Sequence, residues 1–238
     1  MADGTRAIEL QGVSAGYGDT VVLENLSLAI AGGETVSVIG RNGVGKTTLL
    51  ATILGHTTLH GGKVLLHNAD ISRLATYRRV HAGIGYVPQE REIFPSLSVL
   101  ENLTVALRPG PWTVEAVFNL FPRLQERIDN RGNQLSGGEQ QMLAIARALV
   151  GNPSVLLMDE PSEGLAPVIV EELARAVKRL AEAEGLAMVL VEQNTRLALD
   201  ISPRTLVMDR GQIVYDGASE ALRRDPDKLN RLIGVAGK

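Results

Sequence analysis

The sequence predicts an α/β protein with an N-terminal antiparallel β subdomain and an inserted α-helical subdomain. Near-continuous apolar runs at 35–39, 155–158 and 187–191 are typical of strands buried in the middle of a parallel sheet. Residues 6–30 instead alternate loosely between apolar and polar side chains, which indicates an antiparallel pair. Between 98 and 150 the spacing of apolar residues becomes mostly helical, so we expect an insertion of helices into the α/β body.

The first ninety residues are expected to supply most of the strands. The turn of the first pair falls at 16–19, which carries two glycines and an aspartate. The helical segment at 49–54 precedes Gly55, a suitable stop residue. In chain order we therefore expect an antiparallel pair within 6–30, a strand at 35–39, a helix at 49–54, and strands at 63–66 and 85–88.

The rest of the chain alternates between helices and strands. Pro167 suits the first turn of one helix and Gly185 its end, while Asp209-Arg210-Gly211 suits the turn of a final hairpin. We expect one domain over 1–238, with 1–97 and 151–238 forming the core and 98–150 the helical subdomain. The expected elements are helices at 99–107, 114–120, 138–150 and from Pro167 towards Gly185, with strands at 155–158, 187–191, 205–208 and 212–215.

The composition excludes several classes of protein. Hydrophobic residues make up 45% and charged residues 21% of the 238, as in an ordinary globular protein. A net charge of −3 and only three Phe, one Trp and four Tyr argue against a nucleic-acid partner. No apolar run has the length needed to span a bilayer, and the absence of cysteine excludes disulfides.

One glycine-rich stretch matches the pattern of a loop that binds phosphate. It lies between the expected strand at 35–39 and the helix that follows, so helix N–H groups can face an anion. Lys46 would then contact the outer phosphates and the Thr47 hydroxyl would bind Mg²⁺. The alternative is a glycine-rich turn that carries Lys and Thr by chance. The residues expected to bind the nucleotide here are Gly40, Arg41, Asn42, Gly43, Val44, Gly45, Lys46, Thr47 and Thr48.

A pair of carboxylates, Asp159 and Glu160, directly follows the expected strand at 155–158. The carboxyl ends of parallel strands are where α/β sheets bind ligands. We expect Asp159 to hold Mg²⁺, through water, and Glu160 to polarise the water that attacks the γ-phosphate. The alternative is a solvated turn at the end of the strand, formed with Pro161 and Ser162.

A second glycine-rich segment, Leu135-Ser136-Gly137-Gly138-Glu139-Gln140, opens the expected helix at 138–150. Ser136 and the N–H groups of Gly137 and Gly138 would face an anion at the helix N-terminus. The same residues form an ordinary capping box with Glu139, and both interpretations can hold together. Because one nucleotide does not need two such anion-binding segments, this second segment is expected to bind a nucleotide held by another subunit.

With these motifs the chain resembles the ATP-binding subunits of ABC transporters along its whole length. Gly40–Thr47 is similar to Walker A, Val155–Glu160 to Walker B and Leu135–Gln140 to the signature motif. The resemblance implies a P-loop NTPase core of the RecA-like type that hydrolyses ATP with Mg²⁺. It also implies that Gln89 is the Q-loop residue, which contacts the metal, and that Tyr17 stacks on adenine. Two subunits would pair head-to-tail, and each ATP would lie between the Walker A motif of one subunit and the signature motif of the other.

Two departures narrow the resemblance. Ala166-Pro167 stands where the family usually has a D-loop Asp, and Gln193 stands where it has the switch histidine. We expect the Gln193 amide to donate a hydrogen bond to the γ-phosphate without the positive charge of a histidine. Both features resemble one ATPase subunit of branched-chain amino-acid importers, which normally pairs with a second, different ATPase; a homodimer is possible in isolation. Importers of urea and short amides look similar at these positions. The alternatives of another class are a soluble ABC-type ATPase outside transport and a nucleotide-gated interaction module.

An importer ATPase of this kind implies further partners. The family's transmembrane permease subunits insert a short helix beside the Q-loop, which maps to Glu90–Pro95, and a substrate-binding protein acts indirectly through them. Ile93, Phe94 and Leu97 would be apolar contacts there; equally, they could pack within the helical subdomain. The expected location is the cytoplasmic face of the inner or plasma membrane, as a peripheral subunit, with no nucleic-acid partner.

Overall fold

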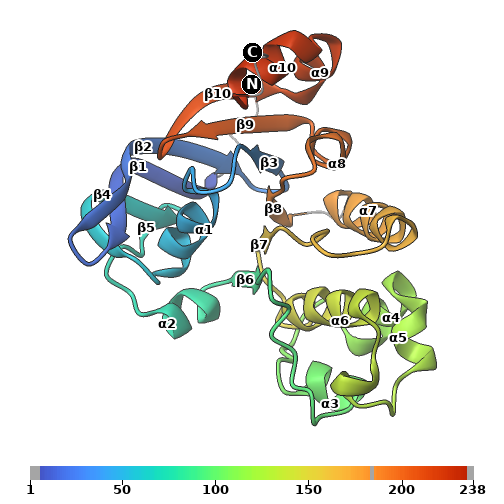
Figure 1. Ribbon diagram of the computed structural model, residues 1–238. Helices are drawn as coiled ribbons and strands as arrows, with labels where there is room; N and C mark the ends of the chain where they lie inside the picture. Colours follow the sequence, from blue (N-terminus) through green and yellow to red (C-terminus); the bar gives the residue numbers. More distant parts are fainter. Residues whose placement is uncertain (1–5, 183–184, 235–238) are drawn as a thin grey trace.

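The computed structural model describes residues 6–182 and 185–234, and the start at 1–5 lies outside them. Its strands form two sheets, with the order β2-β1-β4-β5 in one and β10-β9-β3-β8-β7-β6 in the other (Figure 1). The predicted α/β core with an antiparallel β subdomain and a helical subdomain is therefore confirmed. The strands are β1 Arg6–Tyr17, β2 Thr20–Ala31, β3 Thr35–Ile39, β4 Thr58–Leu66, β5 Ala69–Asp70, β6 Ile84–Val87, β7 Val155–Asp159, β8 Ala187–Val191, β9 Arg204–Asp209 and β10 Gln212–Ala218.

The larger sheet is parallel except for β10, which pairs antiparallel with β9. Every residue of β3, β7 and β8 is buried, which is why these strands are mostly apolar; the exceptions are Thr35 and Ser37 of β3 and Asp159 of β7. Helices α3–α6 gather beside the β6 end of this sheet, next to α7 (Figure 1). The helices are α1 Lys46–Leu54, α2 Thr76–His81, α3 Val99–Thr104, α4 Val114–Leu120, α5 Pro122–Glu126, α6 Gly137–Leu149, α7 Pro167–Ala181, α8 Thr195–Ile201, α9 Ser219–Arg224 and α10 Pro226–Leu232.

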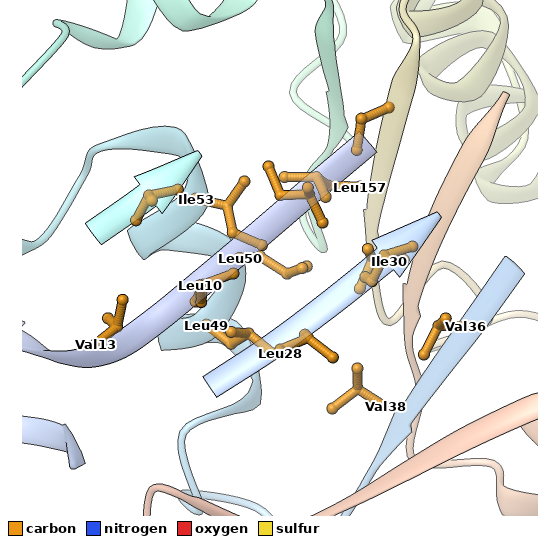
Figure 2. Close-up of a cluster of buried hydrophobic side chains, with 14 of the residues drawn as sticks. Leu10, Val13, Leu28, Ile30, Val36, Val38, Leu49, Leu50, Ile53 and Leu157 are labelled. Atoms are coloured by element: carbon orange, nitrogen blue, oxygen red, sulfur yellow. The ribbon is translucent and has the colours of Figure 1, made fainter. Parts of the chain in front are cut away.

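Helix α1 lies between the two sheets and is buried on nearly all sides. Figure 2 shows Leu49, Leu50 and Ile53 of this helix among side chains from β1, β2, β3 and β7. A fully buried Leu or Ile contributes roughly 1.5–3 kcal/mol of burial free energy. This packing fixes α1, and hence the loop that precedes it, against both sheets.

Strand β4 is longer than the sequence predicted. It begins at Thr58 rather than at Lys63, and the glycines 61–62 lie inside it rather than before it. The pairing of β1 with β4 shifts in register at Ser14 and Gly61, and Gly62 has φ +82°. A Cβ at Gly62 would lie 2.4 Å from the carbonyl oxygen of Gly12. The glycine pair therefore forms a bulge within the strand.

Several short helices escaped sequence analysis because tertiary contacts stabilise them. Helix α2 is held by Arg79, which is 4% exposed and donates to the carbonyl oxygens of Thr52 and Ile53 at the end of α1. The same guanidinium donates to the carbonyls of Ser72 and Leu74. A buried cation is tolerated there because the C-terminus of α1 carries partial negative charge. Helices α5, α8, α9 and α10 were also missed, and each has seven residues or fewer.

Other boundaries differ modestly from the predictions. Helix α3 stops at Thr104 rather than residue 107, and helix α7 ends at Ala181, well before Gly185; residues 183–184 lie outside the described part. Within the described ranges, none of the helices combines the length and apolarity required to cross a membrane.

Candidate functional site

The predicted phosphate loop connects the buried strand β3 to the buried helix α1. Gly40 has φ +155°, and a Cβ there would lie 2.5 Å from the carbonyl oxygen of Met208 on β9. Gly43 and Gly45 also have positive φ, at +79° and +107°, a region that L side chains rarely adopt. The loop can therefore adopt this shape only with glycine at these positions, and it presents the N-terminus of α1 to the site.

Lys46, the first residue of α1, is 5% exposed and turns back into the loop. Its Nζ donates to the carbonyl oxygens of Gly40, at 3.0 Å, and of Arg41, at 3.1 Å. The same nitrogen lies 3.5 Å from Oε1 of Glu160 at the end of β7. A lysine ammonium is a compact charge with three donors, so this arrangement positions a cation at the centre of the loop.

Asp159 is the last residue of β7, is 1% exposed, and accepts a hydrogen bond from Oγ1 of Thr47 at 3.3 Å. Burial raises the pKa of Asp159 to about 6, and the nearby Glu160 carboxylate adds to the rise. The Thr47 hydroxyl and the Lys46 ammonium act in the opposite direction. Two oxygen ligands suited to a hard cation therefore lie together, and one of them is costly to ionise without it.

Asp159→Asn is expected to raise the melting temperature at pH 7.5 in the absence of nucleotide and metal. The pKa of Asp159 is about 6 in the folded chain against 3.8 for the free side chain, so above pH 6 the ionised carboxylate destabilises the folded chain. This difference in pKa corresponds to at most about 3 kcal/mol in the free energy of unfolding. Because protonation relieves the same cost, the gap between variant and wild type should narrow as pH falls below about 6. Thermal unfolding from pH 5 to 8 measures it; a less stable variant at pH 7.5 would contradict the expectation.

Glu160 follows β7 with a left-handed φ of +46° and is 6% exposed. Its N–H donates to the carbonyl oxygen of Val191 on the neighbouring strand β8, at 2.9 Å. Its carboxylate faces Lys46 through Oε1 and accepts a hydrogen bond from Nε2 of Gln193 through Oε2. The backbone of Glu160 is therefore held in a sparsely populated conformation that directs its carboxylate between a cation and an amide.

Gln89 and Glu163 lie beside Lys46 and Glu160, and Nε2 of Gln89 donates a hydrogen bond to the Glu163 carboxylate. Tyr17 lies at the end of β1 and is 51% exposed. A cavity of about 280 Å³ unites most of the predicted residues; its lining includes Asn42, Gly43, Gly45, Lys46, Thr47, Thr48, Gln89, Glu160 and Gln193.

The second predicted anion-binding segment, Ser136 to Gly138, lies at the start of α6 and does not line this cavity. Ser136 caps α6 in a complete capping box: its Oγ accepts from Glu139 N at 3.4 Å, and the Glu139 carboxylate accepts from Ser136 N at 2.8 Å. A Cβ at Gly138 would lie 2.6 Å from the side chain of Ile169 on α7. Ordinary capping and close helix packing are thus both present at this helix start.

One residue next to the site was not singled out from the sequence. Glu192, directly after β8, is 1% exposed, and its carboxylate accepts hydrogen bonds from Ser162. The signal was available, because a carboxylate that follows a fully apolar strand next to the strand of Asp159 must lie at the same sheet edge.

The comparisons with known proteins agree with this geometry. The family model described as ABC transporter matches residues 23–163, more than half of the chain. The chain belongs to this family. It is the ATP-binding subunit of an ABC transporter, in which ATP hydrolysis is coupled to transport.

Relatives of this ABC ATPase extend over nearly its full length. It is 38% identical to the high-affinity branched-chain amino acid transport ATP-binding protein BraG of Pseudomonas aeruginosa, covering 93% of this chain and 97% of that protein. It is 35% identical to the probable branched-chain amino acid transport ATP-binding protein LivF of Archaeoglobus fulgidus, over 88% and 91%. It is 34% identical to the lipopolysaccharide export ATP-binding protein LptB of Escherichia coli K12, over 86% and 87%.

Solved structures of ATP-binding cassettes share the fold. A nucleotide-free cassette from an ABC transporter superposes with a TM-score of 0.81 at 25% identity, covering 98% of this ABC ATPase and all of that chain. A dimeric cassette in a post-hydrolysis state, bound to ADP and Pi, gives a TM-score of 0.77 at 27% identity, over 89% and 98%. The predicted ABC cassette fold is thereby confirmed.

Proposed function

We propose that this ABC ATPase drives the uptake of branched-chain or related amino acids. The observation that carries the proposal is the near-full-length similarity to BraG and LivF, whose names specify branched-chain amino acid transport. The segments Ser162–Pro167 and Val191–Asn194, which depart from the commoner ABC pattern, point to the same group. The similarity to LptB, named for lipopolysaccharide export, is only slightly lower, so the proposal depends on these segments as well.

The site suits a nucleotide held with Mg²⁺. The loop ends at the N-terminus of α1, where helix N–H groups suit a phosphate, and the Lys46 ammonium lies inside it. Thr47 and Asp159 offer the oxygens that would hold Mg²⁺, with Gln89 nearby across the cavity. Magnesium, when bound, neutralises phosphate charge and polarises the phosphoryl oxygens.

In the proposed mechanism, Glu160 acts on the attacking water and Gln193 positions Glu160. The Glu160 carboxylate accepts a proton from that water, while Lys46 stabilises the charge on the outer phosphate. Gln193 orients the Glu160 carboxylate through its amide, as the hydrogen bond between them supports. An amide positions by hydrogen bonding and carries no positive charge, in contrast to a histidine.

Gln193→Ala is expected to lower kcat for ATP hydrolysis by about tenfold, whereas Gln193→His should preserve it. The alanine removes the donor to Glu160, and the imidazole restores a donor of similar reach. Steady-state phosphate release measures both variants, with the exposed Gln212→Ala as a matched control outside the site. Normal turnover in Gln193→Ala would remove this residue from the mechanism.

The residues Ser136, Gly137 and Gly138 are proposed to complete the site of a second subunit. They form a helix N-terminus suited to an anion but lie outside the cavity of their own phosphate loop. A head-to-tail pair would bring each such helix start to the other subunit's ATP. A related cassette is dimeric with ADP and Pi bound, which supports this arrangement. The second subunit is proposed to be a different ATPase in the working importer, with a homodimer formed by the purified chain.

Permease subunits are proposed to dock beside the segment Glu90–Pro95, which would hold this ATPase peripherally at the cytoplasmic membrane face. Phe94 is 47% exposed, whereas Ile93 packs against the helical cluster around α3, α4 and α6. Phe94→Ser is therefore expected to abolish substrate uptake by the assembled transporter while the ATPase activity of the purified chain stays within about twofold of wild type. Uptake unaffected by the change would exclude docking at Phe94.

The transported molecule is tested by reconstitution. Permeases and a substrate-binding protein encoded beside this chain would be assembled with it in proteoliposomes, and ATP-dependent uptake of labelled leucine, isoleucine and valine would be compared with uptake of urea and acetamide. The Glu160→Gln variant serves as the control without hydrolysis. Uptake of urea or acetamide alone would overturn the amino-acid proposal in favour of a urea or short-amide importer.

A further inference from the structure

Glu192 is a buried carboxylate to which the hydrolytic mechanism above gives no role. It is 1% exposed and directly follows the buried strand β8. Its Oε1 accepts from Ser162 N at 3.1 Å, and its Oε2 accepts from Ser162 Oγ at 2.9 Å and from Asn194 N at 3.4 Å. In the described part of the chain its hydrogen bonds thus come from neutral donors. Burying a carboxylate among neutral donors is costly, so its retention needs a reason.

The contacts of Glu192 connect the two loops that carry the proposed catalytic groups. Asp159 pairs with Val191 in register, so Glu160 and Glu192 are the next residues on adjacent parallel strands. From Glu160 the chain passes through Pro161 to Ser162, whose backbone and hydroxyl both bind Glu192. The residue after Glu192 is Gln193, whose amide donates back to the carboxylate of Glu160. These links form a closed ring.

The ring is anchored on both sides. Asn194, the residue after Gln193, caps helix α8 by accepting from Leu197 N at 3.1 Å. Glu160 is tied to β8 by its own N–H, at 2.9 Å from the Val191 oxygen. A shift of the Gln193 backbone relative to Glu160 would therefore disturb the Ser162–Glu192 contact as well. Glu163 and Leu165, which follow Ser162, line the adjoining cavity of about 660 Å³ together with Glu192 and Gln193.

We infer that Glu192 is a positioning residue for ATP hydrolysis, which through Ser162 fixes Gln193 against Glu160. The inference rests on the roles proposed above for Glu160 and Gln193. It also gives the segment 162–165 a direct connection to the reacting centre: a displacement of this segment pulls on the Ser162–Glu192 contact and misaligns the Gln193 amide. Placement errors of about 1 Å at such a centre can reduce turnover by about a hundredfold.

The test compares Glu192→Gln with Ser162→Ala and Ser162→Thr. Glu192→Gln keeps the shape but replaces one acceptor with a donor, so kcat should fall about tenfold while the KM for ATP stays within about twofold. Because burial raises the pKa of Glu192, removing its charge should leave the melting temperature unchanged or higher. Ser162→Ala should lower kcat similarly, and Ser162→Thr, which keeps the hydroxyl, should restore it. The Glu192→Gln/Ser162→Ala double variant should be no slower than either single variant.

Ser219→Ala is the matched control. It removes the hydrogen bond between the buried hydroxyls of Thr205 and Ser219, 2.6 Å apart, which line neither cavity, and kcat should not change. Normal kcat in folded Glu192→Gln and Ser162→Ala would overturn the positioning role. A fall in kcat proportional to a fall in melting temperature would assign Glu192 to stability alone. If Glu160→Gln retained hydrolysis, the proposed mechanism itself would fail. That result is distinct from normal kcat in the Glu192 and Ser162 variants, which would overturn the positioning role of Glu192 alone.

Discussion

Glu160→Gln is expected to reduce ATP turnover by at least about a hundredfold, since a general base contributes that much or more. The amide has the same shape and can still face Lys46 and Gln193, but it cannot accept the proton of the attacking water. The left-handed backbone at Glu160 is set by the bond to Val191 and should not change. Phosphate release under steady-state conditions measures the effect.

ATP binding should survive in Glu160→Gln, with a dissociation constant within about threefold of wild type, because the phosphate loop and Lys46 are intact. Unconsumed ATP should then favour the closed dimer, which light scattering with and without ATP detects. Glu171→Gln removes an exposed carboxylate from the adjoining cavity and is the matched control. Turnover within about threefold of wild type in Glu160→Gln would contradict the assigned role.

The sequence predicts the parts of the fold that are dictated by burial. Strands β3 and β8 were predicted to the residue, and β7 to within one, because a strand buried on both faces is mostly apolar. Helix α2 was not predicted, since what stabilises it is Arg79 inserted under the end of α1, a contact between segments distant in sequence. The strand was predicted to begin only after the glycines at 61–62 for a similar reason: the glycine at 62 is required by the facing Gly12 backbone.

For the site, sequence patterns located the residues but not the contacts between them. The glycine, lysine and threonine spacing predicted the phosphate loop, yet nothing in it indicates that Lys46 faces Glu160. Gln193 was selected from a resemblance, and its hydrogen bond to Glu160 depends on the register of β7 and β8. Glu192 was passed over although it follows an expected strand, as Asp159 and Glu160 do; that its carboxylate is buried and bound to Ser162 is shown only by the structure.

Lys46→Ala is expected to weaken ATP binding by about a hundredfold, equivalent to about 2.7 kcal/mol, the scale of a charge-assisted contact. The ammonium is already held inside the loop by two carbonyl oxygens, so phosphate can gain its charge without ordering a flexible side chain. Titration calorimetry with Mg²⁺-ATP measures the loss. Lys63→Ala, which removes an exposed lysine of β4, should bind ATP normally.

Lys46→Ala also leaves the buried Glu160 carboxylate without its cation, so the variant should melt at a lower temperature than wild type. A lower affinity could then reflect a damaged fold. The double variant Lys46→Ala/Glu160→Gln separates the two causes, because it removes the unpaired charge while the phosphate loop still lacks its lysine. We expect the double variant to recover most of the melting temperature and none of the ATP affinity. Recovery of affinity together with stability would show that Lys46 serves the fold rather than the phosphate.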